Sequence, residues 1–164
     1  MILGFAHPAI VVPDLDKAVA FYCEMFGFKH FCDEGWQPNA AVDRLIGSAG
    51  STCRGCTLAG HNSYLELFEF SAPPPTAPAP GDLGPHEPGI RHLCFYVDDC
   101  RQEYRRFLEL GGRELGQPVD IGGGVYTVYG RDPFGNIIEL AEFPSTEEDL
   151  RNLPGVNCLG DFKS

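Results

Sequence analysis

Two histidines and two glutamates recur at matched places in the two halves of this 164-residue chain. His7 and His92 each begin an apolar run that has Val five positions later and Asp seven positions later. Glu66 and Glu139 each lie inside a later apolar run, where a carboxylate is costly to bury unless it is paired or binds a cation. Two neutral imidazoles and two carboxylates balance a 2+ ion. The pattern therefore predicts one divalent metal (Ni, Co, Mn, Zn or Fe) bound by these four side chains.

A lone histidine on an apolar strand is usually a structural residue with an ordinary hydrogen bond. The duplication argues against that interpretation for His7 and His92, whereas His30, His61 and His86 have no counterpart and are expected on the surface or in loops. Each ligand glutamate is followed three residues later by a second one, Glu69 or Glu142 in the respective half. Side chains alternate across a strand, so we expect the second glutamate of each pair to face water.

The elements that must position these residues repeat as well. An aspartate suited to a helix N-cap is followed 13 positions later by glycine in both halves, from Asp14 to Gly27 and from Asp99 to Gly112. The runs 65–70 and 138–143 resemble each other and are typical of strands. In the second half a short strand at 113–116, a turn at 122–124, a strand at 125–129 and a hairpin at 132–136 complete the order β-α-β-β-β.

The repeat predicts an α+β fold of two tandem βαβββ modules that form a curved mixed sheet around a central metal site. We expect the first module at residues 1–72, a stiff, exposed, Pro-rich linker without secondary structure at 73–89, and the second module at 90–143. The tail 144–164 offers one short helix at 146–153, with capping-box spacing from Ser145 to Glu148. His7 and Glu66 are 59 positions apart, against 47 for His92 and Glu139, which places a longer loop within 36–62.

The amino-acid composition indicates which classes of binding partner to expect. Twelve basic and 23 acidic residues give a net charge of −11, which disfavours nucleic acid and anionic membranes and leaves small molecules and proteins. We see neither a secretory signal nor an apolar run near the roughly 20 residues that a membrane span needs. Seven scattered cysteines indicate free thiols in a reducing cytoplasm. The single CxxC, Cys53 to Cys56, is interpreted as two loop thiols, because a zinc ribbon needs a second pair.

Residues 4–143 resemble the vicinal oxygen chelate superfamily, which includes glyoxalase I, extradiol dioxygenases, methylmalonyl-CoA epimerase and bleomycin- and fosfomycin-resistance proteins. The resemblance rests on the openings at 7–27 and 89–99 and on the closing segment 131–140. The order His-Glu-His-Glu is similar to that of bacterial glyoxalase I, a lyase. The resemblance implies that the metal binds an enediolate through both oxygens as a Lewis acid, while Glu139 or Glu66 shuttles the proton as general base.

Two positions differ from the glyoxalase I pattern. Val11 and Phe70 stand where that family has an Arg and an Asn that contact glutathione. These apolar replacements predict a different, less polar substrate rather than a glutathione conjugate. Arg54, Arg91 and Arg131 are candidate anion contacts for the substrate, against the ordinary alternative of solvated surface arginines.

The leading hypothesis is a metal-dependent lyase or isomerase acting on a small α-oxygenated carbonyl compound. One alternative is a non-haem Fe(II) dioxygenase, in which His7, His92 and Glu139 bind iron and Glu66 does not. The others are an acyl-thioester epimerase and a non-catalytic binding protein of the same fold. The resemblance also implies a homodimer, and the 36–62 segment is a candidate lid.

Overall fold

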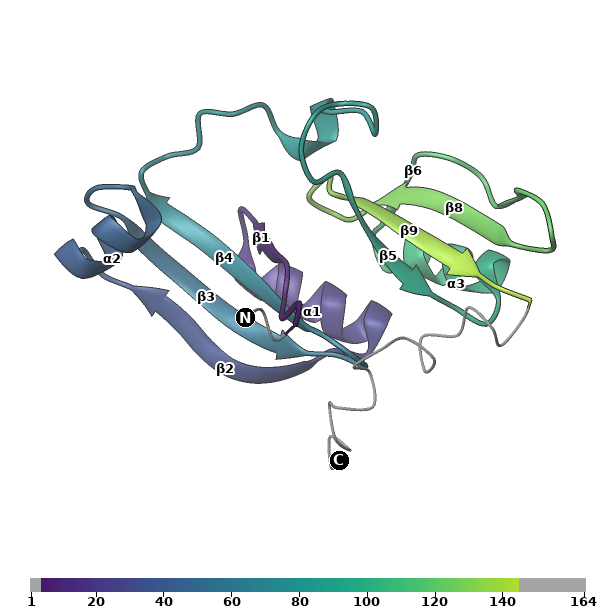
Figure 1. Cartoon of the computed structure of the whole chain (residues 1–164), viewed down its shortest axis with the longest axis horizontal. Helices are drawn as coiled ribbons and strands as arrows, with labels where there is room; N and C mark the ends of the chain where they lie inside the picture. The colour runs from purple at the N-terminus through teal and green to yellow at the C-terminus, as the bar shows by residue number, and fades with distance from the viewer. Residues whose placement is uncertain (1–3, 145–164) are drawn as a thin grey trace. The chain divides into compact units, whose positions relative to one another are not determined.

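The computed structural model describes residues 4–144 of the chain (Figure 1). The chain divides into two compact units, Met1–Ala77 and Pro78–Ser164. The boundary falls inside the predicted 73–89 linker. Each unit carries its own sheet and its own sheet-covering helix, so the α+β class is confirmed.

The first unit has the predicted strand-helix-strand-strand-strand order with one extra helix. Its sheet runs β1-β4-β3-β2, with β1 parallel to β4 and the other neighbours antiparallel. Its elements are β1 (Ala9–Val11), α1 (Leu15–Phe26), β2 (Lys29–Trp36), α2 (Ala40–Ile46), β3 (Thr52–Ala59) and β4 (Tyr64–Ala72).

The 36–62 segment is more structured than the sequence suggested. It contains α2 and all of β3, so the longer loop expected within it is the connection 37–51 between β2 and β3, which includes α2. Asn39 caps the start of α2, and Gly47 ends it at a φ of 70° that favours glycine. No residue of α2 is buried, and β3 mixes Arg, Gly and Thr with apolar residues, so neither element has a clear periodic pattern.

The second unit repeats the order with its second strand interrupted, as the two short pieces β6 and β7. Its sheet runs β5-β9-β8-β6, and β7 also pairs with β8. The parallel β5–β9 pair matches the parallel β1–β4 pair of the first unit. Its elements are η1 (Pro80–Asp82), β5 (His92–Tyr96), α3 (Cys100–Glu109), β6 (Arg113–Glu114), β7 (Val119–Asp120), β8 (Tyr126–Arg131) and β9 (Ile137–Glu142).

In each unit one helix covers one face of the sheet (Figure 1). The apolar face of the helix packs against alternate residues of the strands and forms the core. The burial of this apolar surface stabilises the unit. In the first unit the fully buried members include Tyr22, Leu58, Leu65 and Leu67, and in the second they include Phe107, Ile138 and Leu140. The opposite face of each sheet carries the matched His and Glu residues.

The second glutamate of each pair holds a helix start and does not simply face water, which corrects the sequence expectation. Glu69 Oε2 accepts a 2.9 Å hydrogen bond from the Leu15 amide, and Glu142 Oε2 accepts one of the same length from the Cys100 amide. These amides belong to the first residues of α1 and α3, whose N-terminal N–H groups need acceptors. The predicted N-caps, Asp14 and Asp99, accept from the amides three residues on.

The predicted linker is partly structured. Residues 80–82 form the short 3₁₀ helix η1, so the expectation of no secondary structure at 73–89 is wrong there. The guanidinium of Arg131 donates to the carbonyls of Pro80 and Leu83 at 3.1 and 2.9 Å, which fixes this segment to the second unit. The predicted tail helix at 146–153 lies outside the described residues.

Candidate metal centre

In the first unit, β1 and β4 bring His7 and Glu66 together. The parallel register places Ala9 opposite Glu66, and His7 lies two residues before Ala9, so its side chain falls on the same face. Nε2 of His7 lies 3.2 Å from Oε2 of Glu66, and the two side chains are 39% and 22% exposed. The pair is therefore accessible on the helix-free face of the sheet.

The second unit repeats this arrangement with the same register. Cys94 lies opposite Glu139 in the parallel β5–β9 pair, and His92 lies two residues before Cys94. Nε2 of His92 lies 3.1 Å from Oε2 of Glu139, with side-chain exposures of 37% and 18%. The sequence repeat thus corresponds to a repeat in geometry, from strand register to the separation of the two polar atoms.

The separation within each pair suits two neighbouring ligands of one metal. Metal bonds of about 2.1 Å at right angles place the two donor atoms about 3 Å apart. The observed 3.1 and 3.2 Å match that value, and the donors are one imidazole nitrogen and one carboxylate oxygen in each case. Each pair has the chemistry and spacing of half of a mixed N/O metal site.

Neither pair is a complete metal site. Within residues 4–144 no group of three or more His, Cys, Asp or Glu side chains is arranged to hold a metal ion. A divalent metal in such an N/O environment usually takes at least four ligands. The four-residue site predicted from the sequence thus stays a prediction.

The surroundings of the two glutamates differ. Oε1 of Glu139 accepts a 2.8 Å hydrogen bond from the Thr127 hydroxyl, and the hydroxyl of Tyr129 lies 3.5 Å from Nδ1 of His92. Burial of the phenol, together with the nearby Glu139 carboxylate, raises the pKa of Tyr129. The second-unit pair is thus braced on both sides, by a hydroxyl at the carboxylate and a phenol at the imidazole.

The first-unit pair has no such bracing among the described residues. Thr57 lies opposite Glu66 in the β3–β4 pair, but its hydroxyl donates instead to Oε1 of Glu34 at 3.3 Å. The position that corresponds to Thr127 is Gly55, since each lies two residues further from the ligand glutamate on the neighbouring strand. Glu66 therefore keeps more freedom to move than Glu139.

Three aromatic side chains lie on the same face as Glu66, further along the strands. Trp36 of β2 lies 5.7 Å from Phe68 and 5.6 Å from Phe70 of β4, measured between ring centroids. We call Trp36, Phe68 and Phe70 the aromatic platform. All three are half-buried. A Cβ at Gly55 would lie 2.5 Å from the ring of Phe68, so glycine on the intervening strand allows the ring to lie there.

A hydrogen-bond chain from the α2 segment fixes the indole. Nε1 of Trp36 donates to the hydroxyl of Ser51 at 2.8 Å, and that hydroxyl lies 3.3 Å from Oδ1 of Asp43. Asp43 also accepts from the Gly50 and Ser51 amides, and these bonds hold the pKa of its carboxyl below the usual value, the Gly50 amide most of all. Sequence reasoning missed this cluster, because it depends on the β2–β3–β4 register.

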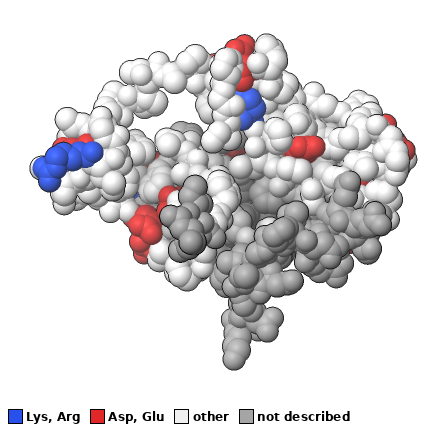
Figure 2. Space-filling view, viewed as in Figure 1, with Lys and Arg blue, Asp and Glu red and all other residues white. Residues whose placement is uncertain are grey.

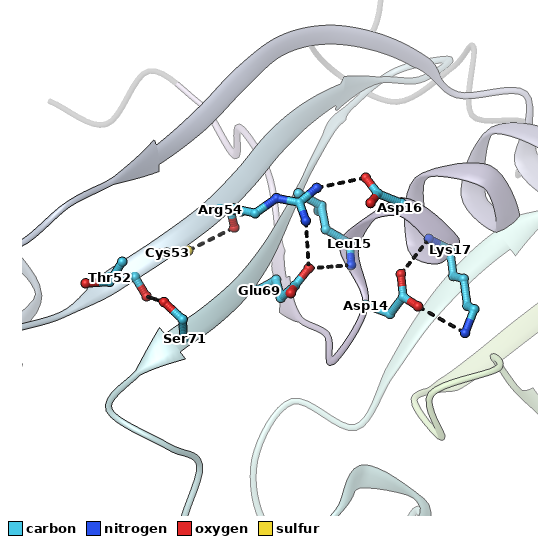
Figure 3. A network of polar contacts seen from close by, with 9 residues as sticks. All are labelled: Asp14, Leu15, Asp16, Lys17, Thr52, Cys53, Arg54, Glu69 and Ser71. Carbon is cyan, nitrogen blue, oxygen red and sulfur yellow. Dashed lines mark hydrogen bonds and ion pairs between the residues drawn. The ribbon is translucent and has the colours of Figure 1, made fainter.

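The three candidate substrate arginines have protein partners. Arg54 belongs to the helix-covered face, where it lies 2.9 Å from Asp16 and 3.7 Å from Glu69 (Figure 3). Arg91 donates to the Gly84 carbonyl at 3.3 Å, and Arg131 binds backbone carbonyls of its own unit. Their role as substrate contacts stays a prediction.

The CxxC cysteines lie in β3 and not in a loop, which corrects the sequence interpretation. Cys53 and Cys56 are buried and three residues apart, so they point to opposite faces of the sheet. Burial raises the pKa of Cys56 to about 11, which disfavours the thiolate that metal or disulfide chemistry needs. All six described cysteines are free.

The other histidines have partners outside the matched pairs. His30 lies 2.9 Å from Asp33, and His86 lies 3.4 Å from Glu87. Nε2 of His61 lies 3.1 Å from the carbonyl of Phe26 at the end of α1. None of these three contacts involves a residue of the matched pairs.

Two further features, the distribution of basic side chains and the length of the helices, bear on possible partners. On the face drawn in Figure 2, basic side chains of described residues form isolated groups and not a continuous patch. The absence of nucleic-acid binding stays a prediction. Among the described helices, none has the length and apolar character that crossing a bilayer requires.

Comparison with known proteins defines the class. Residues 4–140 match the family model described as "Glyoxalase/Bleomycin resistance protein/Dioxygenase superfamily". The chain belongs to this superfamily.

Particular relatives refine this assignment. The chain is 33% identical over 150 residues to 2-epi-5-epi-valiolone epimerase of Actinomyces sp, covering 85% of this chain and 79% of that protein. Its fold is similar to that of a glyoxalase family protein from Bacillus cereus (TM-score 0.78, 24% identity, 87% and 95% of the two chains covered). It also resembles the fosfomycin resistance protein FosX of Listeria monocytogenes, solved with Mn(II) and sulfate (TM-score 0.56, 18% identity, 90% and 98% covered).

Proposed function

We propose that the protein is a divalent-metal-dependent isomerase, specifically an epimerase, of a small compound that carries adjacent oxygen atoms at a carbonyl. The observation that carries this proposal is the exact repetition of one His–Glu pair in both units, at 3.2 and 3.1 Å. The relative named as an epimerase, at 33% identity, supports an isomerase over the other chemistries of the superfamily.

His7, Glu66, His92 and Glu139 together hold the metal in this proposal. The two half-sites supply two neutral imidazoles and two carboxylates, which neutralise a 2+ charge. A divalent metal bound there supplies Lewis-acid polarisation of substrate oxygens. FosX, with Mn(II) in its solved structure, supports a divalent metal for this fold.

Glu66 is the proposed general base. Its described polar contact is with His7 alone, whereas Glu139 is held by both His92 and Thr127. The carboxylate of Glu66 takes the proton from the carbon beside the carbonyl, and the C–H electron pair moves towards the carbonyl oxygen. Return of a proton to the opposite face of that carbon inverts it, with no net oxidation and no second reactant.

The substrate is proposed to differ from a glutathione conjugate. Val11 is 56% exposed on β1, and Phe70 belongs to the aromatic platform, so both positions present hydrocarbon where glyoxalase I has polar glutathione contacts. An apolar surface cannot satisfy a substrate carboxylate taken out of water. A homodimer stays part of the proposal, and sedimentation of the purified protein tests it.

Metal content is the decisive measurement. The wild type is purified without added metal or chelator beside Glu66→Gln, and Glu69→Gln serves as the matched control from the other face of β4. We expect about one equivalent of Ni, Co, Mn or Zn in the wild type and in Glu69→Gln, and much less in Glu66→Gln. Metal-dependent exchange of the α-hydrogen of a hydroxyketone with D₂O, followed by NMR, tests the reaction itself.

Other results would replace the proposal. Iron held equally by the wild type and Glu66→Gln, together with O₂ consumption, would establish the dioxygenase alternative. A protein that takes up no metal even on reconstitution would point to a non-catalytic binding protein.

A further inference from the structure

The two units share the His–Glu pair, but among the platform residues only Phe70 has an aromatic counterpart, Phe143, which lies four residues after Glu139 and packs on Tyr96. The second-unit positions that correspond to Phe68 and Gly55 are Ala141 and Thr127, since each lies two residues beyond the ligand glutamate or its neighbour. The α2 segment that fixes Trp36 also has no counterpart between β6 and β8. The rings of Phe68 and Trp36 are therefore additions to one copy of a duplicated scaffold, as a substrate-selecting feature would be.

The platform lies on the sheet face that carries the candidate ligand, and two of its rings, Phe68 and Phe70, lie on the same strand as that ligand. Phe68 is two residues from Glu66 along β4, a distance of about 7 Å in a strand. A small molecule whose oxygens lie at Glu66 therefore brings its next few carbon atoms over Phe68 and Trp36. Half-buried aromatic rings beside a few polar groups are the usual lining of a small-molecule site.

The charged residues at the strand positions nearest this surface do not favour an anion. The strand position next to Trp36 on the same face is the exposed acid Glu34. Arg54 of β3 points to the opposite face, where Asp16 and Glu69 hold it (Figure 3). An uncharged group fits here, and a phosphate or carboxylate does not.

The indole is fixed in place before any ligand binds. Ser51 is completely buried, accepts the Trp36 N–H, and is itself held by Asp43. A side chain fixed by such a series of hydrogen bonds loses little conformational entropy when a ligand binds. This favours recognition of a flat or compact ligand surface. Three rings within 6.4 Å of one another offer a continuous patch.

We propose that Trp36, Phe68 and Phe70 form the substrate-selecting subsite and that the substrate is an uncharged carbon ring bearing adjacent oxygens. The ring covers the aromatic platform through its C–H face, while its oxygens reach towards Glu66. Ser51 and Asp43 act as positioning residues for the indole. This inference rests on the proposed function for the chemistry at the oxygenated end only.

Trp36 is the single tryptophan of the chain, so its fluorescence reports on the platform without any turnover. The metal-reconstituted protein is titrated with 2-hydroxycyclohexanone, with the acyclic hydroxyacetone, and with the anionic dihydroxyacetone phosphate. We expect the ring compound to change the emission saturably, to protect Trp36 from acrylamide, and to bind about 10-fold more tightly than the other two.

Variants separate the platform from the metal chemistry. Phe70→Ala should weaken binding of the ring compound by about 10-fold. Phe31→Ala removes an aromatic ring that packs against Tyr64 at a tilted angle and should leave this binding unchanged. Ser51→Ala gives a second test that keeps the platform side chains. It should shift the Trp36 emission of the ligand-free protein and weaken binding of the ring compound. Circular dichroism confirms that each variant is folded.

The outcomes are distinct for the two proposals. Glu66→Gln, which loses metal, should abolish proton exchange; the ring compound should bind it more weakly but still change the emission of Trp36 through the intact platform. Equal affinities for the cyclic and acyclic compounds, or a response that survives both Phe70→Ala and Ser51→Ala, would overturn the platform as a ring subsite. No response to any of the three compounds would overturn it as well.

Discussion

The hydroxyl of Thr127 lies 2.8 Å from Oε1 of Glu139, on the oxygen that does not contact His92. In the first unit the corresponding strand position is Gly55, which has no side chain to offer Glu66. The two His–Glu pairs therefore differ in the hydrogen bonds that hold their glutamates. A fixed ligand and a movable one suit a site in which one carboxylate remains on the metal while the other handles a proton.

Removal of this hydroxyl should weaken metal binding. Thr127→Val keeps the shape of the side chain, frees Glu139 to rotate, and should lower metal affinity by about 10-fold to 100-fold, the usual effect of losing a partner of a ligand. Competition with a chelator of known affinity measures the change. Thr57→Val is the control, since its hydroxyl bonds to Glu34 and not to Glu66. Equal losses in both variants would show that Thr127 has no special role.

Helix anchoring by the second glutamates is a separate, structural prediction. Glu142→Ala leaves the Cys100 amide at the start of α3 without its 2.9 Å acceptor. The loss should destabilise the protein by about 1–2 kcal/mol, as other N-terminal caps do, without changing metal content. Chemical denaturation gives the stability change, and Glu109→Ala at the exposed end of the same helix is the control. A loss of metal in Glu142→Ala would contradict this division of roles.

The internal repeat of the sequence predicted much of the fold, because residues at matched positions of the two halves occupy matched positions in the two sheets. Matched spacings from His to Val to Asp fixed the first strand and helix of each unit, and the side-chain alternation gave the correct face to His7, Glu66, His92 and Glu139. Alternation also separated Glu69 from Glu66. It could not say that a helix N-terminus lies on that other face, because this requires the packing of α1 against β4.

Features that occur in only one of the two units could not be predicted from the repeat. Trp36, Ser51 and Phe70 are far apart in the chain and meet only through the pairing of β2, β3 and β4. The helix α2 buries nothing, so it lacks the apolar stripe by which helices are recognised. The backbone carbonyls to which Arg131 donates likewise cannot be identified from residue types.

The Asp43 support of Trp36 should depend on pH. Its hydrogen bonds from Gly50 and Ser51 lower the folded-state pKa of the Asp43 carboxyl below its usual value of 3.8. A depressed carboxyl pKa contributes stability that is fully present above the unfolded-state value and is lost as the pH falls through the folded-state value. Trp36 emission should therefore be constant between about pH 7 and pH 5 and move to the red below about pH 4.

Two variants decide whether this acid step belongs to Asp43. Asp43→Ala should show red-shifted emission already at neutral pH and no step below about pH 4, since the group that titrates is gone. Asp14→Ala is the matched control: Asp14 also has a lowered pKa through a backbone hydrogen bond, but it caps α1 and has no bond to the Trp36 chain. If the step survives in Asp43→Ala and disappears in Asp14→Ala, acid acts on Trp36 through loss of the α1 cap, and Asp43 is not its support.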